Sequence, residues 1–215
     1  MGIVRSFENE KFYHLYNRGV AKQKIFQDSN DYQRLLDNFA YYLDSGLKQK
    51  ISMVSKKKLI EVLSSGPKKP LVSVVCYCLM PNHLHLIVKQ LQDSGISQFM
   101  KDALNSYSRY YNTKYERVGP VFQGRFKAVE IEDDDQLIHL SRYVHINPCM
   151  ANITDHLENY PWSSLKLFIN NKKTRLCNPE LIMEIVGSTK EYQNFVDDYA
   201  GYAKKLLEID NLLLE

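Results

Sequence analysis

The amino-acid sequence lacks the usual marks of a membrane, secreted or disulfide-bonded protein. It has no apolar run long enough to cross a bilayer, and its first residues, MGIVRSFENEKF, have no apolar core of the kind found in secretory signals. It has 4 cysteines, and no two of them form a C-x-x-C pair. Neither a structural zinc site nor a disulfide framework is therefore expected, and the sequence predicts a protein of the reducing cytoplasm that makes no contact with a membrane.

Internal repeats and long low-complexity segments are also absent. Hydrophobic residues make up 44% of the chain and charged residues 25%, which is ordinary for a folded globular protein. The 215 residues are enough for one generous domain, or for one domain with an appendage, and for a sizeable core.

The net charge of +3 is unevenly distributed along the chain. Residues 45–70 contain seven lysines and a single glutamate, whereas acidic residues are in excess over residues 131–215. A basic middle is typical of a surface that binds a polyanion, but a solvated lysine-rich loop would have the same composition. Charge alone leaves both interpretations open.

Seven segments have the patterns of regular secondary structure. Aromatic or aliphatic runs bounded by turn residues predict strands, at 11–19, 71–80, 83–90 and 126–132. Apolar residues at helical spacing or helix-cap residues predict helices, at 28–44, 96–112 and 133–147. Pro148 is expected to stop the last of these helices. The lysine-rich segment 45–70 is weakly periodic and is interpreted as an insertion or a partly helical excursion.

The order of these elements predicts the fold. Strand, helix, strand, strand, helix and strand follow one another as in the β-α-β-β-α-β arrangement of ferredoxin-like proteins. We therefore expect an α+β fold, a ferredoxin-like sheet with helices on one face. The predicted organisation is one domain over residues 1–150, with the basic insertion at 45–70, and a C-terminal helical extension over residues 151–215. Trp162 is expected to pack the extension onto the domain.

The stretch YCLMPNHLHLIVKQ places two histidines on one face of a strand. Because side chains alternate along a strand, His83 and His85 point away from the apolar face formed by Leu84 and Leu86. Two side chains about 7 Å apart along a strand can converge on one metal ion. The spacing by itself is a weak signal, because two half-exposed histidines with hydrogen-bond partners have the same pattern.

A second polar face is predicted on the helix at 133–147. Tyr143 and Asn147 are four residues apart, with His139 one turn earlier, so burial alone does not account for them. One interpretation is a partly exposed tyrosine and an asparagine cap ahead of Pro148. The other makes Asn147 an oxygen ligand and Tyr143 a nucleophile. Two imidazoles and an amide oxygen leave coordination positions open, which suits Mg²⁺ or Mn²⁺, and a nearby cation would favour the phenolate that such a nucleophile needs.

Four blocks in order, YHLYNRG, YCLMPNHLHLIV, GPVFQGRFK and LSRYVHINP, resemble the single-tyrosine HUH transposases, in particular the REP-associated tyrosine transposases. The resemblance spans roughly residues 10–150, and YPWSSL at 160–165 is similar to the sequence that follows the domain in that branch. It implies that residues 1–150 form a catalytic domain with its site on the face of the sheet. It also implies that His83 and His85 bind the metal ion and that Tyr143 attacks single-stranded DNA, leaving a free 3′-hydroxyl and a 5′-phosphotyrosine. Asn147 falls where the family has a third polar ligand, often glutamine. A residue before proline is biased away from helical geometry, so Asn147 is either that ligand or a cap.

DNA contacts are predicted for five residues around these blocks: Arg18, Arg109, Gln123, Arg125 and Lys127. Each of them alone has the simpler explanation of a surface polar group. Among the other tyrosines, Tyr107 and Tyr111 belong to an apolar stripe and are expected to pack in the core.

The expected function is metal-dependent nicking and rejoining of single-stranded, hairpin-forming DNA. The reaction needs no ATP, since it exchanges a phosphodiester for a phosphotyrosine ester of similar energy. One alternative keeps the fold without the chemistry, as a protein that binds structured nucleic acid. Another is a hydrolase that uses water in place of tyrosine. The sequence does not distinguish a monomer from a homodimer.

Overall fold

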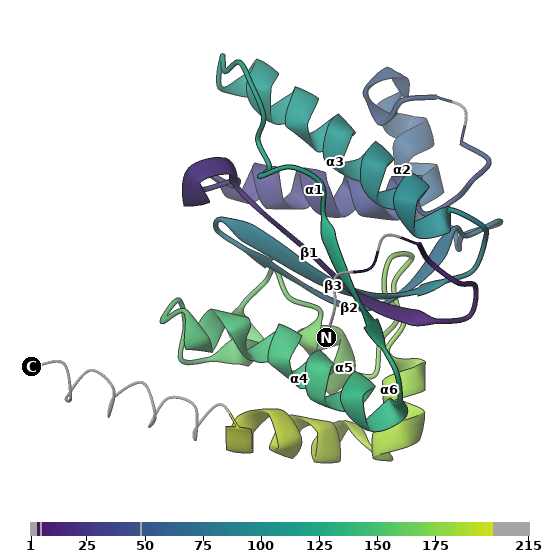
Figure 1. Cartoon of the computed structure of the whole chain (residues 1–215), viewed down its shortest axis with the longest axis vertical. Coiled ribbons are helices and arrows are strands. Elements are labelled where there is room, and N and C mark those ends of the chain that lie inside the picture. Colours follow the sequence, from purple (N-terminus) through teal and green to yellow (C-terminus); the bar gives the residue numbers. More distant parts are fainter. Residues whose placement is uncertain (1–3, 5, 48, 200–215) are drawn as a thin grey trace, which may run out of the picture.

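The sheet of the molecule has four strands and is antiparallel throughout. The structure, a computed structural model, describes residue 4 and residues 6–47 and 49–199. The strands, in the order β2-β3-β1-β4, are β1 (Phe12–Arg18), β2 (Val72–Met80), β3 (His83–Gln90) and β4 (Lys127–Ile131) (Figure 1). This order is that of a ferredoxin-like sheet, so the predicted fold class is confirmed. None of the helices in the described residues is long and apolar enough to span a membrane.

Two crossover helices cover one face of the sheet. α1 (Ser29–Tyr42) and α3 (Gly95–Lys114) pack against each other there, and α2 (Lys56–Ser64) contacts α1 (Figure 1). Helix α2 lies in the basic insertion, which is therefore partly helical, as predicted. The core between this layer and the sheet includes Leu84 and Leu86.

A second helical layer covers the other face. It includes α4 (Asp134–Met150), α5 (Leu165–Ile169), α6 (Glu180–Val186) and the helical residues 189–199, and Ile87 of β3 points into its core (Figure 1). Because the sheet is buried on both sides, β2 is apolar along almost its whole length, VSVVCYCLM. The sequence analysis expected helices on one face, and this second layer corrects that expectation. The nearly unbroken apolar run of β2 was the signal for it. Short 3-10 helices lie at Val20–Lys22, Ile51–Met53 and Leu157–Asn159.

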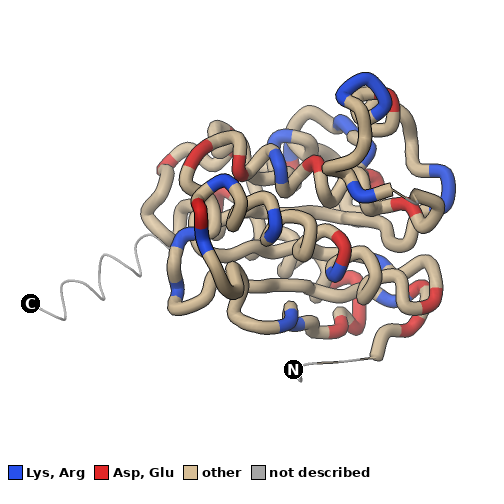
Figure 2. The backbone as a smooth tube through the Cα atoms, turned by 90° about the horizontal axis from the view of Figure 1, so that it is seen from above, with Lys and Arg blue, Asp and Glu red and all other residues tan. Residues whose placement is uncertain are grey.

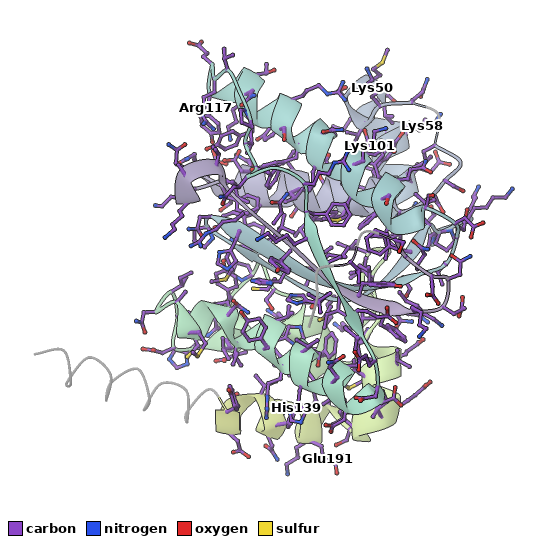
Figure 3. The ribbon with its side chains drawn as sticks, viewed as in Figure 1. Lys50, Lys58, Lys101, Arg117, His139 and Glu191 are labelled. Carbon is purple, nitrogen blue, oxygen red and sulfur yellow. The ribbon has the colours of Figure 1, made fainter. Side chains whose placement is uncertain are left out.

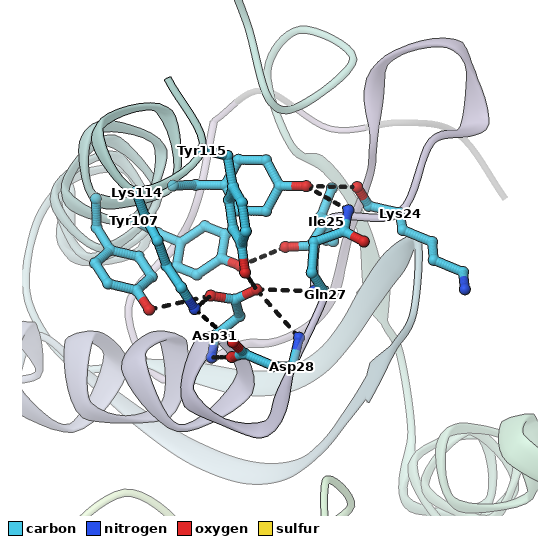
Figure 4. A network of polar contacts seen from close by, with 10 residues as sticks. Lys24, Ile25, Gln27, Asp28, Asp31, Tyr107, Lys114 and Tyr115 are labelled. Carbon is cyan, nitrogen blue, oxygen red and sulfur yellow. Dashed lines mark hydrogen bonds and ion pairs between the residues drawn. The ribbon is translucent and has the colours of Figure 1, made fainter. Parts of the chain in front are cut away.

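Helix α1 begins at a capping box that extends into a buried polar cluster. The side chains of Asp28 and Asp31 accept hydrogen bonds from each other's backbone N–H groups. Asp31 is fully buried and also accepts from Tyr110, Tyr115 and the ammonium group of Lys114, at 2.8 to 3.0 Å (Figure 4). The Asp31 cluster (Asp31, Tyr110, Lys114 and Tyr115) therefore ties the start of α1 to the end of α3. Tyr107 and Tyr111 are buried beside it, as predicted.

Helix α4 continues past the proline that was expected to stop it. It runs to Met150 with Pro148 inside, and its C-terminal cap is Ala151, whose N–H bonds to the Asn147 carbonyl. The interpretation of Asn147 as the cap is therefore wrong. A proline removes one backbone donor, and burial of the last turn, including Pro148 and Cys149, favours the helix in spite of that loss.

The described part of the C-terminal extension packs on the α4 layer. His145 of α4 is fully buried, and its ring nitrogens contact the Tyr192 hydroxyl at 2.7 Å and the Ser164 hydroxyl at 2.8 Å. Trp162 stacks on Tyr32 of α1 with ring centroids 4.6 Å apart, as expected for a residue that packs the extension onto the domain. Residues 200–215 of the extension lie outside the described residues. The division of the chain at residue 150 stays a prediction.

Candidate active site

Pairing of β1 with β3 brings three histidines onto one face of the sheet. In the antiparallel register, Tyr16 lies opposite His85 and Arg18 opposite His83, so that His14 falls on the same face as the predicted pair. The rings of His83 and His85 converge, with centroids 5.0 Å apart. His14 Nε2 lies 2.9 Å from His85 Nδ1. These residues form the histidine cluster (His14, His83 and His85).

His14 was missed in the sequence. Its position in YHLYNRG shows a histidine on a strand, but only the pairing of two strands far apart in the chain places it against His85. His14 and His85 are buried, with 8% and 7% of their surface exposed. The periodicity of one strand carries no information about its neighbour, so no local signal was available.

Burial keeps the histidine cluster in its uncharged form at neutral pH. Desolvation lowers the pKa of His14 to about 4. The pKa of His85 falls well below the ordinary value through desolvation and then through its two histidine neighbours, and desolvation and Arg18 lower the pKa of His83. A neutral imidazole has one nitrogen with a free lone pair, which is the form that binds a metal ion.

The neighbours of both predicted ligands engage the same ring atom. His83 Nδ1 lies 2.7 Å from Asn82 Oδ1, and His85 Nδ1 lies 2.9 Å from His14 Nε2. When Nδ1 of each ring carries the proton for these bonds, Nε2 keeps the lone pair. Metal-binding histidines in proteins are commonly oriented in this way, by a partner on the nitrogen that does not coordinate.

Helix α4 adds a tyrosine and an asparagine to the same face. The ring of Tyr143 stands edge-on to those of His85 and His14, with centroids 5.8 and 6.3 Å apart, and 45% of Tyr143 is exposed. The Asn147 amide donates to the Tyr143 backbone carbonyl at 2.6 Å, and the Asn147 side chain is within hydrogen-bonding reach of His83. The structure therefore brings together Tyr143, Asn147 and the predicted histidine pair.

His139 does not join them. Its ring contacts Arg142 at 2.9 Å and lies near Asp135 and Phe195, beside the last described segment of the chain. A helix turns about 100° per residue, so His139 and Asn147, eight residues apart, differ in direction by about 80°. The predicted polar face is correct for Tyr143 and Asn147 but wrong for His139.

A pocket of about 400 Å³ opens beside the two metal-ligand candidates. It is lined by Tyr16, Asn17, Arg18, His83, His85, Gln123, Arg125 and Lys127. Four of the five residues predicted to contact DNA are in this lining, together with both predicted histidines. No lining residue is acidic, so three cations surround the mouth of a site with neutral imidazoles, an arrangement that attracts an anionic ligand. We call it the histidine pocket.

The loop before β4 delivers the basic side chains to this pocket. The Gln123 N–H donates to the Arg18 carbonyl at 2.7 Å, which holds the loop against the end of β1. Gly124 has a φ of +77°, a conformation that favours glycine, and Arg125 follows it directly. Lys127 starts β4 and lies 6.0 Å from the centroid of the Tyr16 ring.

Arg109 lies elsewhere. It is on α3, on the other face of the sheet, where it lines a separate pocket with Arg34 and Lys50. The structure does not bring it to the histidine pocket, because α3 packs against α1 rather than beside β1 and β4. Its contact with DNA stays a prediction.

The residues present fit a divalent metal ion in an open site. Among the described residues, no group of three or more His, Cys, Asp or Glu side chains is arranged to hold a metal ion, so the protein would contribute the two imidazoles of His83 and His85 and the amide oxygen of Asn147. The Asn147 amide nitrogen donates to the Tyr143 carbonyl, so the amide oxygen is the atom of Asn147 that could bind a metal ion. The remaining ligands would be oxygens of water or of a phosphate, as is usual for Mg²⁺ and Mn²⁺.

Comparison with known proteins places the chain in a family. Residues 12–147, more than half of the chain, match the family described as "Transposase IS200 like". The chain belongs to the IS200-like transposase family. This confirms the resemblance found in the sequence and assigns a DNA-processing role. The matched range includes the three residues of the histidine cluster together with Tyr143 and Asn147.

The fold of this IS200-like transposase is similar to that of a solved structure. A REP-associated tyrosine transposase, solved bound to a REP hairpin, aligns with a TM-score of 0.52 and 14% identity over 79% of this chain and 86% of that chain. At this identity the likeness concerns the fold alone. No curated protein matches the chain.

Proposed function

We propose that this IS200-like transposase nicks and rejoins single-stranded, hairpin-forming DNA through a 5′-phosphotyrosine on Tyr143. One observation carries the proposal. The half-exposed Tyr143 ring stands edge-on to His85, 5.8 Å between centroids, at a face where every candidate metal ligand is an uncharged group. A nucleophile and an electrophilic centre must approach the same phosphate, and this is the geometry that such an approach needs.

The proposed chemistry is a balanced exchange of esters. The Tyr143 oxygen attacks phosphorus and loses its proton, the bond from phosphorus to the 3′-oxygen breaks, and that oxygen leaves as a 3′-hydroxyl with a proton. The new ester joins Tyr143 to the 5′-phosphate, and a second 3′-hydroxyl can reverse the step. Since one phosphate ester replaces another, no nucleotide cofactor is required.

Residues of the histidine pocket would hold the substrate for this step. Arg18, Arg125 and Lys127 line the same pocket as the histidine pair, so they would bind phosphates next to the scissile one. Mg²⁺ or Mn²⁺ at His83, His85 and Asn147 would polarise the scissile phosphate and offset its developing charge. Tyr16, whose ring stacks near His85 at 6.1 Å, would border the strand on the side of β1.

One copy of the chain carries every part of this proposed site. Tyr143 contacts the histidines of its own chain, so no second subunit has to supply a residue. We therefore propose that a monomer is sufficient for nicking. The four cysteines are free thiols, which supports a reducing cytoplasm as the place of action.

Covalent capture of DNA tests the proposal. A labelled single-stranded hairpin is incubated with the protein and Mn²⁺ and separated on a denaturing gel. Tyr143→Phe is expected to lower the yield of the protein-linked band by roughly 10⁴-fold or more, because it removes the attacking oxygen, while hairpin affinity stays nearly unchanged. Tyr199→Phe makes the same change at another partly exposed tyrosine and is expected to behave like the native chain.

The same gel separates the alternatives. An adduct that persists in Tyr143→Phe would assign the attack to another side chain. Nicking by the native chain without a protein-linked band would mean that water is the nucleophile. Binding without nicking would leave only a protein that recognises structured nucleic acid.

A further inference from the structure

The loop between β1 and α1 has a constrained backbone. We call residues 19–25 the β1–α1 loop. Ala21 and Lys22 have φ values of +51° and +60°, in the left-handed region that is unfavourable for residues other than glycine. Gly19 passes so close to the other side of the loop that a Cβ on it would clash with the Gln23 carbonyl oxygen. A backbone of this kind persists only where its surroundings hold it in place.

The C-terminal end of α3 anchors the β1–α1 loop. The Tyr107 hydroxyl donates to the Ile25 carbonyl, and the Tyr111 hydroxyl donates to the Lys24 carbonyl at 3.2 Å (Figure 4). Arg117, labelled in Figure 3 just beyond α3, donates to a side chain of the same loop at 3.3 Å. The loop is therefore fixed to the helical layer that lies across the sheet from the histidine cluster.

The β1–α1 loop also contacts the turn between β2 and β3. The Ile25 N–H donates to the Pro81 carbonyl and the Gly19 N–H donates to the Asn82 carbonyl, both at 2.8 Å. The Asn82 side-chain amide donates to the Lys22 carbonyl at 3.1 Å. Three hydrogen bonds therefore join the loop to the two residues directly before β3.

The last of these bonds determines which atom of Asn82 faces His83. Because the amide nitrogen donates to Lys22, the amide oxygen is the atom that lies 2.7 Å from His83 Nδ1. An amide oxygen accepts a hydrogen bond and cannot donate one, so Nδ1 carries the proton. Desolvation and Arg18 lower the pKa of His83, and its neutral ring has a single N–H. Nε2 is therefore left with the lone pair that a metal ion needs.

Positive charge would give the β1–α1 loop a simpler role. Its two lysines, Lys22 and Lys24, are exposed, but lysine and arginine are spread over the chain and do not distinguish this loop (Figure 2). The bond to Asn82 is made by the carbonyl of Lys22 and not by its side chain. The link from the loop to the histidine cluster therefore depends on the path of the backbone.

We propose that the β1–α1 loop positions His83 through Asn82. The loop orients the Asn82 amide, and the amide oxygen keeps the proton of His83 on Nδ1, so that Nε2 stays open for a ligand. Gly19 and Asn82 are positioning residues, because they act on His83 and not on the reacting atoms. The inference rests on the proposed function, in which His83 is a metal ligand, and it adds the residues that set the state of that ligand.

Nitrogen NMR of the metal-free protein tests the role of Asn82. Long-range ¹H–¹⁵N spectra at neutral pH show which ring nitrogen is protonated, and the His83 signals are those lost in His83→Gln. The native chain should have its proton on Nδ1. Asn82→Ala removes the acceptor, so both nitrogens should share the proton, whereas Asn82→Asp keeps an acceptor oxygen and should keep the native pattern. A native His83 protonated on Nε2, or an unchanged spectrum in Asn82→Ala, would overturn the proposal.

Calorimetric titration with Mn²⁺ alone tests the role of the loop. Gly19→Ala places a methyl group against the Gln23 carbonyl oxygen, and Asn82→Ala removes the oxygen that faces His83. Each is expected to bind Mn²⁺ about tenfold more weakly than the native chain. Because the loop acts through Asn82, the double variant should bind no more weakly than Asn82→Ala. Native affinity in Gly19→Ala, or losses that add in the double variant, would overturn the role of the loop.

Gly66→Ala is the matched control for that titration. A Cβ on Gly66 would meet nothing within 4 Å, so this variant should bind Mn²⁺ as the native chain does. A thermal melt checks that each variant is folded. If Gly19→Ala is not, the NMR result on Asn82 decides the proposal by itself.

Failure of this proposal is distinguishable from failure of the proposed function. The NMR samples contain neither metal ion nor DNA, so they report on His83 whether or not the chain nicks DNA. A native chain that binds no Mn²⁺ would count against the metal site of the proposed function. An unchanged spectrum in Asn82→Ala would overturn the positioning role alone, since covalent capture by Tyr143 does not test it.

Discussion

Two buried polar clusters lie on opposite faces of the sheet, and they differ in how far their hydrogen bonds are satisfied. The carboxylate of Asp31 accepts from Lys114, Tyr110 and Tyr115 and from the Gln27 N–H, so both of its oxygens are occupied. In the histidine cluster, the contacts of His83 and His85 engage Nδ1, and the cluster borders a pocket of about 400 Å³.

Polar groups of the first kind stabilise the fold, whereas those of the second kind can still bind a ligand. A buried donor or acceptor that finds all its partners inside the protein stabilises the fold and has nothing left for a ligand. A buried ring with a free lone pair at the wall of a pocket costs stability unless a ligand completes it, and such groups gather at functional sites.

Removing the carboxylate of the Asp31 cluster should destabilise the fold. Asp31→Ala leaves two tyrosine hydroxyls and the Gln27 N–H without their acceptor and leaves the Lys114 ammonium group with Asp28 as its one carboxylate partner among the described residues. A loss of about 3 kcal/mol in the free energy of unfolding is expected. Asp37 lies on the same helix and, among the described residues, is bonded to Gln33 alone. Asp37→Ala should change the free energy of unfolding by less than about 0.5 kcal/mol. Urea unfolding measures both. If Asp31→Ala lowered the free energy of unfolding as little as Asp37→Ala does, the Asp31 cluster would contribute little to stability.

Changing His14 should affect metal binding more than stability. His14→Phe keeps an aromatic ring but removes the nitrogen that orients His85, so affinity for Mn²⁺ is expected to fall about 10 to 100-fold, with a smaller fall for His14→Gln, whose amide can still bond to Nδ1. Calorimetric titration with Mn²⁺ gives the affinity, and a thermal melt gives the stability.

His156→Phe is the matched control for that experiment, since His156 is exposed and lies apart from the cluster. It should keep native affinity. If His14→Phe bound Mn²⁺ as tightly as the native chain, His14 would have no positioning role.

Acidification should weaken the fold through the Asp31 cluster. Burial alone would raise the pKa of Asp31, but bonds from Lys114, the Gln27 N–H, Tyr115 and Tyr110 outweigh it and hold the pKa below its ordinary value. A carboxyl group of this kind stabilises the folded state above the unfolded pKa, and the contribution is lost as the pH falls through the folded pKa.

The expected pH effect is small and appears below about pH 4. One such group adds a slope of at most ~1.4 kcal/mol per pH unit to the unfolding free energy, and Asp31→Asn should lack that part of the slope. Unfolding of both proteins in urea across the acid range gives the two slopes. Parallel curves would mean that Asp31 does not titrate differently in the folded state.

Some positions could be predicted because their signals are local. The strand at 83–90 was predicted with the bounds that β3 has, since its alternation of apolar and polar residues is visible within eight letters. The same alternation correctly placed His83 and His85 away from Leu84 and Leu86. Helical spacing predicted that Tyr107 and Tyr111 are buried.

Other positions could not be predicted, because distant partners decide them. Packing of the last turn of α4 outweighs the stop signal of Pro148. His139 shares a predicted face with Tyr143, yet Arg142 and Phe195 hold it elsewhere. Arg109 has the same chemistry as Arg125, and only the packing of α3 on α1 separates their pockets.

Residue spacing is enough to predict the strands and helices of the ferredoxin-like sheet and the two imidazoles on one strand face, because backbone geometry turns spacing directly into side-chain direction. The bond of His14 to His85, 71 residues further along, and the place of Tyr143 beside both rings depend instead on how the chain packs. Those contacts depend on which strands pair and where α4 lies on the sheet, and these are properties of the whole packed chain rather than of any segment.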